Sequence, residues 1–100
     1  MGDKNKRNNF VYILQCKDNS LYTGWTNDID KRLEAHNSGR GAKYTRGRGP
    51  VRLVHLETFE TKEEALKRER AIKRLSTEKK WKLVIEDTES EREKSGNEGL

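Results

Sequence analysis

Residues 10–24, FVYILQCKDNSLYTG, place two apolar runs on either side of a short polar connection. Phe10–Leu14 are aromatic, β-branched or aliphatic, which is typical of a strand, and Leu21–Thr23 resume the pattern. Between the two runs, Lys17–Ser20 supply the aspartate, asparagine and serine that favour a turn. The stretch therefore predicts a β-hairpin whose second strand ends at Gly24.

The residues after this hairpin predict a helix over about 28–36, with Asn27 as its N-cap. An ideal helix turns by about 100° per residue, so Ile29, Leu33, Arg32 and His36 share one side. The arginine and the histidine thus lie on the side that the two aliphatic residues must bury.

The rest of the chain predicts one more strand and two more helices. The glycine-rich and basic segment Ser38–Pro50 is expected to be a loop, and Val51–Phe59 a third strand. Thr61–Glu64 form a capping box that opens a helix to about Leu75, and Thr77 is expected to cap a final helix. The order β-β-α-β-α-α predicts an α+β fold, a three-stranded antiparallel sheet flanked by helices.

The net charge of +5 is unevenly distributed along the chain. Glu86–Leu100 hold six acidic and two basic residues, so the remainder is strongly basic. We expect residues 1–8 to be a disordered N-terminus, 9–85 the folded domain and 86–100 a disordered acidic tail. The basic domain favours a polyanionic partner, nucleic acid first; a solvated basic surface with no partner is the alternative.

Length and composition exclude several classes of protein. A chain of 100 residues has room for one domain. Its single cysteine excludes an internal disulfide or a cysteine-built zinc site and fits a reducing compartment. Because no window approaches the ~18 apolar residues of a membrane span, and the N-terminus lacks an apolar leader, we expect a cytoplasmic protein with no membrane partner.

Glu69 falls within the apolar stripe of the second predicted helix, between Ala65 and Ile72. A carboxylate that faces a core needs a partner, since burying an unpaired charge is costly. Two explanations are open. Glu69 forms a structural ion pair with Arg32, or the two helices present a cation, an imidazole and a metal-ligating carboxylate to a shared groove.

These residues form an ordered set with a characteristic spacing. The set comprises Phe10-Val11-Tyr12, then Tyr22-Thr23-Gly24, Arg32, His36 one helical turn later, and Glu69. The chain resembles the GIY-YIG nuclease superfamily, in particular its small stand-alone bacterial members, from Asn9 to about Ile85. Phe10 and Thr23 replace a glycine and an isoleucine of the two name-giving motifs, while both tyrosines are present.

The resemblance implies hydrolysis of phosphodiester bonds with one divalent ion, Mg²⁺ or Mn²⁺. It implies that Glu69 holds the ion and that Arg32 binds the scissile phosphate. A tyrosine would deprotonate the attacking water; we favour Tyr12, with Tyr22 hydrogen-bonding nearby, although either fits. His36 would orient the tyrosine or relay its proton, and Arg32, the metal or His36 is expected to lower the phenol pKa.

Other residues are expected to contact the substrate. Gly24 would let the backbone approach nucleic acid closely. The loop would contribute bases for phosphates and one aromatic ring for stacking: Arg40, Lys43, Tyr44, Arg46 and Arg48. The alternative for this loop is a solvated linker.

Three functions are open at this level. The first is a metal-dependent DNA nuclease that prefers a DNA structure over a sequence, with a role in DNA repair. The second is a nucleic-acid-binding module without catalysis, because relatives often carry an asparagine that Thr77–Leu83 lack. The third is an accessory protein of a larger repair or recombination complex. DNA is a more natural partner than RNA in each case.

Overall fold

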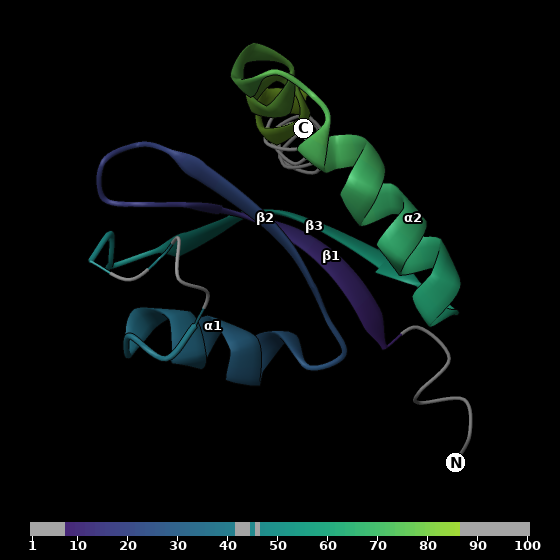
Figure 1. Ribbon diagram of the computed structural model, residues 1–100, viewed down its shortest axis with the longest axis horizontal. Helices are drawn as coiled ribbons and strands as arrows, with labels where there is room; N and C mark the ends of the chain where they lie inside the picture. The colour runs from purple at the N-terminus through teal and green to yellow at the C-terminus, as the bar shows by residue number, and fades with distance from the viewer. Residues whose placement is uncertain (1–7, 42–44, 46, 87–100) are drawn as a thin grey trace, which may run out of the picture.

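The computed structural model describes residues 8–41, 45 and 47–86. Its elements are β1 (Asn9–Gln15), β2 (Leu21–Thr26), α1 (Ile29–Asn37), β3 (Arg52–Phe59) and α2 (Lys62–Lys73), followed by a helix over residues 77–86. The predicted α+β order is confirmed (Figure 1). The predicted disordered ends lie outside the described residues except for Asn8 and for Glu86, which is helical.

The three strands form one antiparallel sheet in the order β2-β1-β3. As the central strand, β1 pairs Tyr12 with Gly24 on one side and with Leu56 on the other. The β1–β2 turn is held by the Asp18 carboxylate, which accepts hydrogen bonds from the backbone and side chain of Ser20. The hairpin predicted from residues 10–24 is therefore present, and β2 continues through Gly24 to Thr26.

Alternate residues of β1 point to opposite faces of the sheet. Val11 and Ile13 belong to the apolar cluster that includes Ala65 and Ile72 of α2. Tyr12 and Leu14 belong to a second cluster, with Ile29 and Leu33 of α1 packed against it. We call these the α2 face and the α1 face; Figure 1 shows α1 on one side of the sheet and α2 with the final helix on the other.

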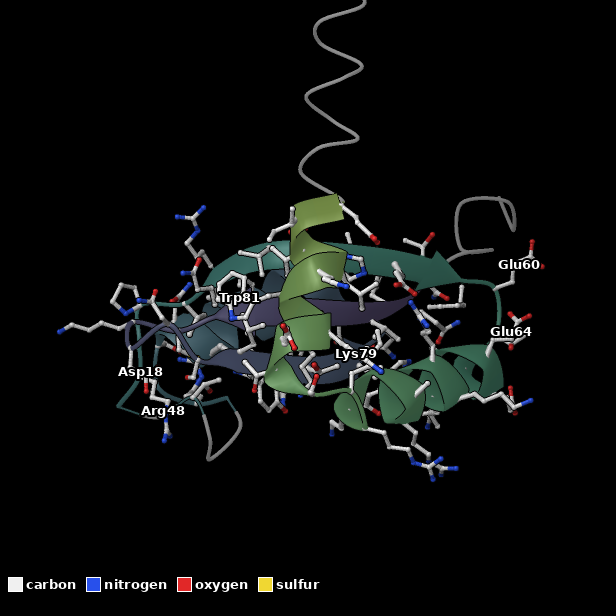
Figure 2. All side chains as sticks on the ribbon, turned by 90° about the horizontal axis from the view of Figure 1, so that it is seen from above. Asp18, Arg48, Glu60, Glu64, Lys79 and Trp81 are labelled. Atoms are coloured by element: carbon white, nitrogen blue, oxygen red, sulfur yellow. The ribbon has the colours of Figure 1, made fainter. Side chains whose placement is uncertain are left out.

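The α2 face holds the apolar core of the fold. Its buried members are Val11, Ile13, Leu21, Ala65, Ile72 and Val84. Figure 2 shows the final helix running across the sheet, with Trp81 beside the strands, and this side chain packs partly buried against the same cluster. Burial of each large aliphatic side chain is worth about 1.5–3 kcal/mol, so this face supplies much of the stability.

The helix α1 is capped by Asp28 and not, as the sequence suggested, by Asn27. Asp28 has an extended backbone, and its carboxylate accepts the Lys31 N–H at 3.1 Å. The shift of one residue follows from the length of β2, because Thr26 still belongs to the strand and its hydroxyl accepts the Asp28 N–H at 3.1 Å.

The other two helix starts can also be compared with expectation. The capping box at Thr61 is confirmed, since its hydroxyl accepts the Glu64 N–H while the Glu64 carboxylate accepts the Thr61 N–H. The expected cap at Thr77 is wrong: the Ser76 hydroxyl accepts the Lys79 N–H at 3.2 Å. Ser76 immediately precedes the helix over residues 77–86, which is the place where a cap must stand. Within the described part of the chain, no helix has the length and apolar character needed to cross a membrane.

Candidate active site

Tyr12 is at the centre of a polar group on the α1 face. It comes from the central strand of the sheet, and its side chain is 1% exposed. Tyr12 lies opposite Gly24, where an added Cβ would come within 2.5 Å of the Tyr12 hydroxyl oxygen and 3.1 Å of the Tyr22 ring. Glycine at this position therefore makes room for the Tyr12 phenol to lie over the edge strand β2. The contact with nucleic acid expected for Gly24 stays a prediction.

The helix α1 brings a cation and an imidazole to this phenol. Arg32 Nε donates a hydrogen bond to the Tyr12 hydroxyl at 3.3 Å, and His36 Nε2 lies 3.1 Å from the same oxygen. The two α1 residues are four apart and share one face of the helix. The prediction that they point inward with Ile29 and Leu33 is confirmed for His36, which is 1% exposed; Arg32 is partly buried.

The two tyrosines and the histidine form an aromatic cluster. The ring centroids are 6.3 Å apart for Tyr12 and Tyr22, 5.9 Å for Tyr12 and His36, and 5.3 Å for Tyr22 and His36, all in tilted or edge-on arrangements. Tyr22 also hydrogen-bonds to Arg32, an interaction that raises the pKa of the guanidinium together with the stronger bond to Tyr12. All four predicted catalytic side chains are thus in mutual contact.

The pKa of Tyr12 lies above its ordinary value, contrary to the direction that we expected. Burial of the phenol is the largest cause, and electrostatic interactions with Tyr22 and with the Glu69 carboxylate add to it. Arg32 acts in the expected direction, lowering the pKa through its hydrogen bond and its charge, but burial outweighs it. Tyr12 is therefore a neutral phenol at pH 7, and it can act as a base only if another group takes its proton.

His36 is placed to accept that proton. Burial and the nearby positive charge of Arg32 hold the pKa of His36 below its ordinary value, so the imidazole is neutral at pH 7. A neutral imidazole has one nitrogen free to accept a proton. On the side away from Tyr12, His36 Nδ1 lies 2.8 Å from the hydroxyl of Thr45, which is also buried.

Glu69, on α2, acts on the same region through its charge. Its side chain is 17% exposed, and its carboxylate forms an ion pair with Lys73 Nζ at 3.3 Å. Its charge acts on Tyr12, whose pKa it raises. The described residues contain no ion pair between Glu69 and Arg32, so the structural pair considered from the sequence is absent.

These residues also bear on the expected metal ion. Among the described residues, no group of three or more histidine, cysteine, aspartate or glutamate side chains could hold a metal. Mg²⁺ commonly binds through one or two carboxylates and completes its shell with water and substrate phosphates. Glu69 therefore fits an ion shared with a substrate, and it does not fit a metal site preformed by protein ligands alone.

Two of the predicted loop contacts are described, and both are paired with acids. Arg40 Nη2 lies 3.6 Å from the Glu34 carboxylate, and both side chains are well exposed. Arg48 Nε donates to the Asp18 carboxylate at 3.2 Å, and Figure 2 shows the two residues together at one end of the sheet. The other three predicted contacts, Lys43, Tyr44 and Arg46, lie outside the described residues.

Two polar interactions were not anticipated from the sequence. Thr45 lies among the basic residues of the loop, and it was not singled out from the sequence because it carries no charge. Its hydroxyl group, nine residues after His36, is the one feature of the sequence that could have indicated a role. On the α2 face, Glu57 accepts two hydrogen bonds from Arg68, at 2.8 and 3.0 Å, and lies 2.7 Å from His55 Nε2. No sequence pattern paired these residues, because they come from β3 and α2.

Comparison with known proteins found a matching family and several relatives. The family described as the GIY-YIG catalytic domain matches residues 8–83. Among curated relatives, the UPF0213 protein CPE1444 of Clostridium perfringens is 63% identical over 76 residues, which cover 76% of this chain and 82% of the relative.

Two solved structures are similar to this chain. The solution NMR structure of the UPF0213 protein BH0048 from Bacillus halodurans has a TM-score of 0.52 at 57% identity, covering 77% of this chain and 82% of that protein. The solution NMR structure of EF2693 from E. faecalis has a TM-score of 0.57 at 43% identity, covering 84% and 90%. Both similarities extend over most of the folded part of the chain.

Proposed function

The chain belongs to the GIY-YIG family, and from this premise we propose that it is a metal-dependent nuclease that hydrolyses phosphodiester bonds in DNA. One observation carries the proposal: Tyr12, Arg32 and His36 form a single hydrogen-bonded group, and the charge of Glu69 acts on its phenol. A base, a cation for phosphate and a carboxylate for a metal are the components that this reaction requires.

The proposed mechanism begins with the neutral phenol. Tyr12 gives its proton to His36 Nε2, 3.1 Å away, and takes a proton from the attacking water. The water oxygen bonds to phosphorus, and the bond from phosphorus to the 3′ oxygen breaks. The 3′ oxygen leaves with the bonding electrons and takes a proton from solvent, which balances the proton held by His36. The positive charge of Arg32 stabilises the phenolate of Tyr12, so it partly offsets the effect of burial, which raises the Tyr12 pKa.

Arg32 also binds the phosphate in this proposal. A guanidinium has several N–H donors, so the bond from Nε to Tyr12 leaves others for the non-bridging oxygens. Glu69 would hold one Mg²⁺ or Mn²⁺ ion, and the charge of the ion, when it is bound, would offset the negative charge on the phosphate and the departing oxygen. Lys73, the present partner of Glu69, has to release the carboxylate for this purpose.

Substrate choice follows from the size of the domain in this proposal. A compact domain of this size has little surface for reading base edges, so contacts to the DNA backbone dominate. We therefore propose a preference for a DNA structure, such as a flap, nick or branch, and a role in DNA repair.

A nucleic-acid-binding module without catalysis is the second candidate. Thr77–Leu83 contain no asparagine, and Lys73 already neutralises Glu69. Such a module would use the basic surface alone, and its affinity would fall steeply with salt.

The test is cleavage of labelled linear, flapped and branched DNA, and matched RNA, with Mg²⁺ or Mn²⁺. We expect Glu69→Gln and Arg32→Ala each to lower the rate by about a hundredfold or more. The matched controls are Glu63→Gln, an exposed acid of the same helix, and Lys31→Ala, an exposed cation beside Arg32; both should keep the activity.

Two outcomes would contradict the proposal that the protein is a nuclease. No cleavage by any form, with salt-sensitive binding that Glu69→Gln leaves unchanged, would favour the binding module. Neither cleavage nor binding would favour an accessory protein that acts through a larger complex.

A further inference from the structure

Thr45 is a buried hydroxyl joined to the polar group of the α1 face. Its side chain is 1% exposed, and Oγ1 lies 2.8 Å from His36 Nδ1, which is shorter than the 3.1 Å between His36 Nε2 and the Tyr12 hydroxyl. Three side chains from β1, α1 and the connection between α1 and β3 thus form one continuous chain of hydrogen bonds.

One assignment of donors and acceptors is consistent with every bond in this chain of hydrogen bonds. Arg32 Nε can only donate, so the Tyr12 oxygen accepts from it and the phenol proton points elsewhere. His36 Nε2 lies within reach of that proton and accepts it when the imidazole is protonated on Nδ1. A neutral imidazole that accepts at Nε2 carries its own proton on Nδ1, which then donates to the Thr45 oxygen.

The backbone near Gly41 holds the same imidazole from another side. A Cβ at Gly41 would collide with His36 Nδ1, and it would lie within 2.7 Å of Cγ and 2.8 Å of Cα of that residue. Because one of these atoms is backbone, the collision could not be relieved by rotating a side chain. The ring therefore has little freedom to turn away from its two hydrogen-bond partners.

We propose that Thr45 is a positioning residue, which fixes His36 as the tautomer protonated on Nδ1 and so keeps Nε2 ready to accept the Tyr12 proton. The catalytic meaning of this inference rests on the proposed nuclease function, whereas the tautomer itself does not. The described hydrogen bond that joins Thr45 to this polar group is the one to His36, so Thr45 acts on the reaction through that residue.

The tautomer can be measured directly by long-range ¹H–¹⁵N NMR of the imidazole rings in the full chain. The chain has two histidines, so the spectrum of His55→Gln identifies the His36 signals. We expect wild-type His36 at pH 7.5 to show a protonated Nδ1 and an unprotonated Nε2. Wild-type His36 protonated on Nε2 would overturn the proposal whatever the variants do.

Two variants distinguish the effect of the Thr45 hydroxyl group from the effect of the volume that the side chain fills. Thr45→Val keeps the shape and removes the hydroxyl, and we expect the Nδ1-protonated form to lose its dominance. Thr45→Ser keeps the hydroxyl, and we expect the wild-type tautomer. An unchanged tautomer in folded Thr45→Val would overturn the proposal; if that variant does not fold, the wild-type and Thr45→Ser spectra decide.

Kinetics then test the link to catalysis. We expect Thr45→Val to lower kcat by about tenfold to a hundredfold, the range found when a residue that orients a histidine is lost, with KM nearly unchanged. Thr45→Ser should restore most of kcat. An altered tautomer with unchanged kcat would contradict the positioning role, whereas a wild type that cleaves nothing would contradict the proposed function and leave the tautomer result valid.

Discussion

The two faces of the sheet differ in what they bury. The α2 face buries aliphatic side chains, such as Ile13 and Ile72, against each other. The α1 face buries a phenol, an imidazole and a hydroxyl that are hydrogen-bonded to one another. Burying a polar group is costly unless the group is paired. The stability of the α1 face therefore depends on hydrogen-bond geometry, whereas the stability of the α2 face depends on how well the side chains fill the space. One strand, β1, supplies both faces through the alternation of its side chains.

The largest effect on stability should come from the α2 face. Ile72 is fully buried, and Ile72→Ala should lower the free energy of unfolding by about 2–5 kcal/mol through lost burial and a cavity. Urea denaturation measures the change, with partly exposed Leu56→Ala as the control, which should cost less than about 1.5 kcal/mol. In the folded fraction, the NMR signals of the His36 ring should stay as in wild type. Equal losses in the two variants would contradict the assignment of the core to this face.

A smaller effect should follow from crowding the α1 face at Gly24. The Cβ of Gly24→Ala would meet the Tyr12 hydroxyl oxygen at 2.5 Å, so the phenol has to move from Arg32 and His36. We expect a loss of about 1–3 kcal/mol, as for other overpacked sites, together with a changed His36 ring spectrum. Gly49→Ala is the control, because an added Cβ there meets nothing within 4 Å. A wild-type His36 spectrum in Gly24→Ala would show that the phenol tolerates the methyl group.

The smallest of the three effects concerns the polar interaction of the α2 face. The hydrogen bond from His55 and then the bonds from Arg68 lower the pKa of Glu57 from 4.5 to about 2, against the opposing effect of burial. A carboxyl with a depressed pKa stabilises the fold above its unfolded pKa, and this contribution is lost as the pH falls from about 4.5 to about 2. Glu57→Gln should therefore lower stability by about 1–2 kcal/mol at pH 7 and by much less at pH 3.

Urea midpoints at the two pH values measure this difference. Glu63→Gln is the control, since this exposed acid of α2 should give a midpoint close to wild type at both pH values. A deficit for Glu57→Gln that is the same at pH 3 and pH 7 would mean that the effect is loss of packing and not of charge.

Much of the fold could be predicted from local sequence. The hairpin followed from two apolar runs around a turn, and the capping box at Thr61 followed from its side-chain chemistry. The two errors in helix caps were each of one residue, at Asn27 and Thr77. In both cases an adjacent residue, Asp28 or Ser76, has equivalent capping chemistry, so composition could not decide between them.

Part of the candidate site could also be predicted, from helical periodicity and from the resemblance. Helical periodicity placed Arg32 and His36 on one side of α1 and Glu69 within the apolar stripe of α2, and the resemblance added the two tyrosines. Periodicity cannot find a partner that is distant in sequence and carries no charge, so Thr45 was missed. The expectation that Arg32, the metal or His36 lowers the pKa of Tyr12 was wrong, because burial of the phenol, which raises the pKa, is a property of the packed molecule.

The sequence by itself determined the order of the elements, the apolar alternation of β1 and the chemical groups that the site contains, because these depend on residues near one another along the chain. Only the tertiary structure decided which groups meet: Tyr12 with His36, His36 with Thr45, and Glu69 with Lys73 in place of Arg32. Hydrogen bonds and desolvation depend on distances of a few ångströms between atoms, and those distances are set when the sheet and its helices pack together.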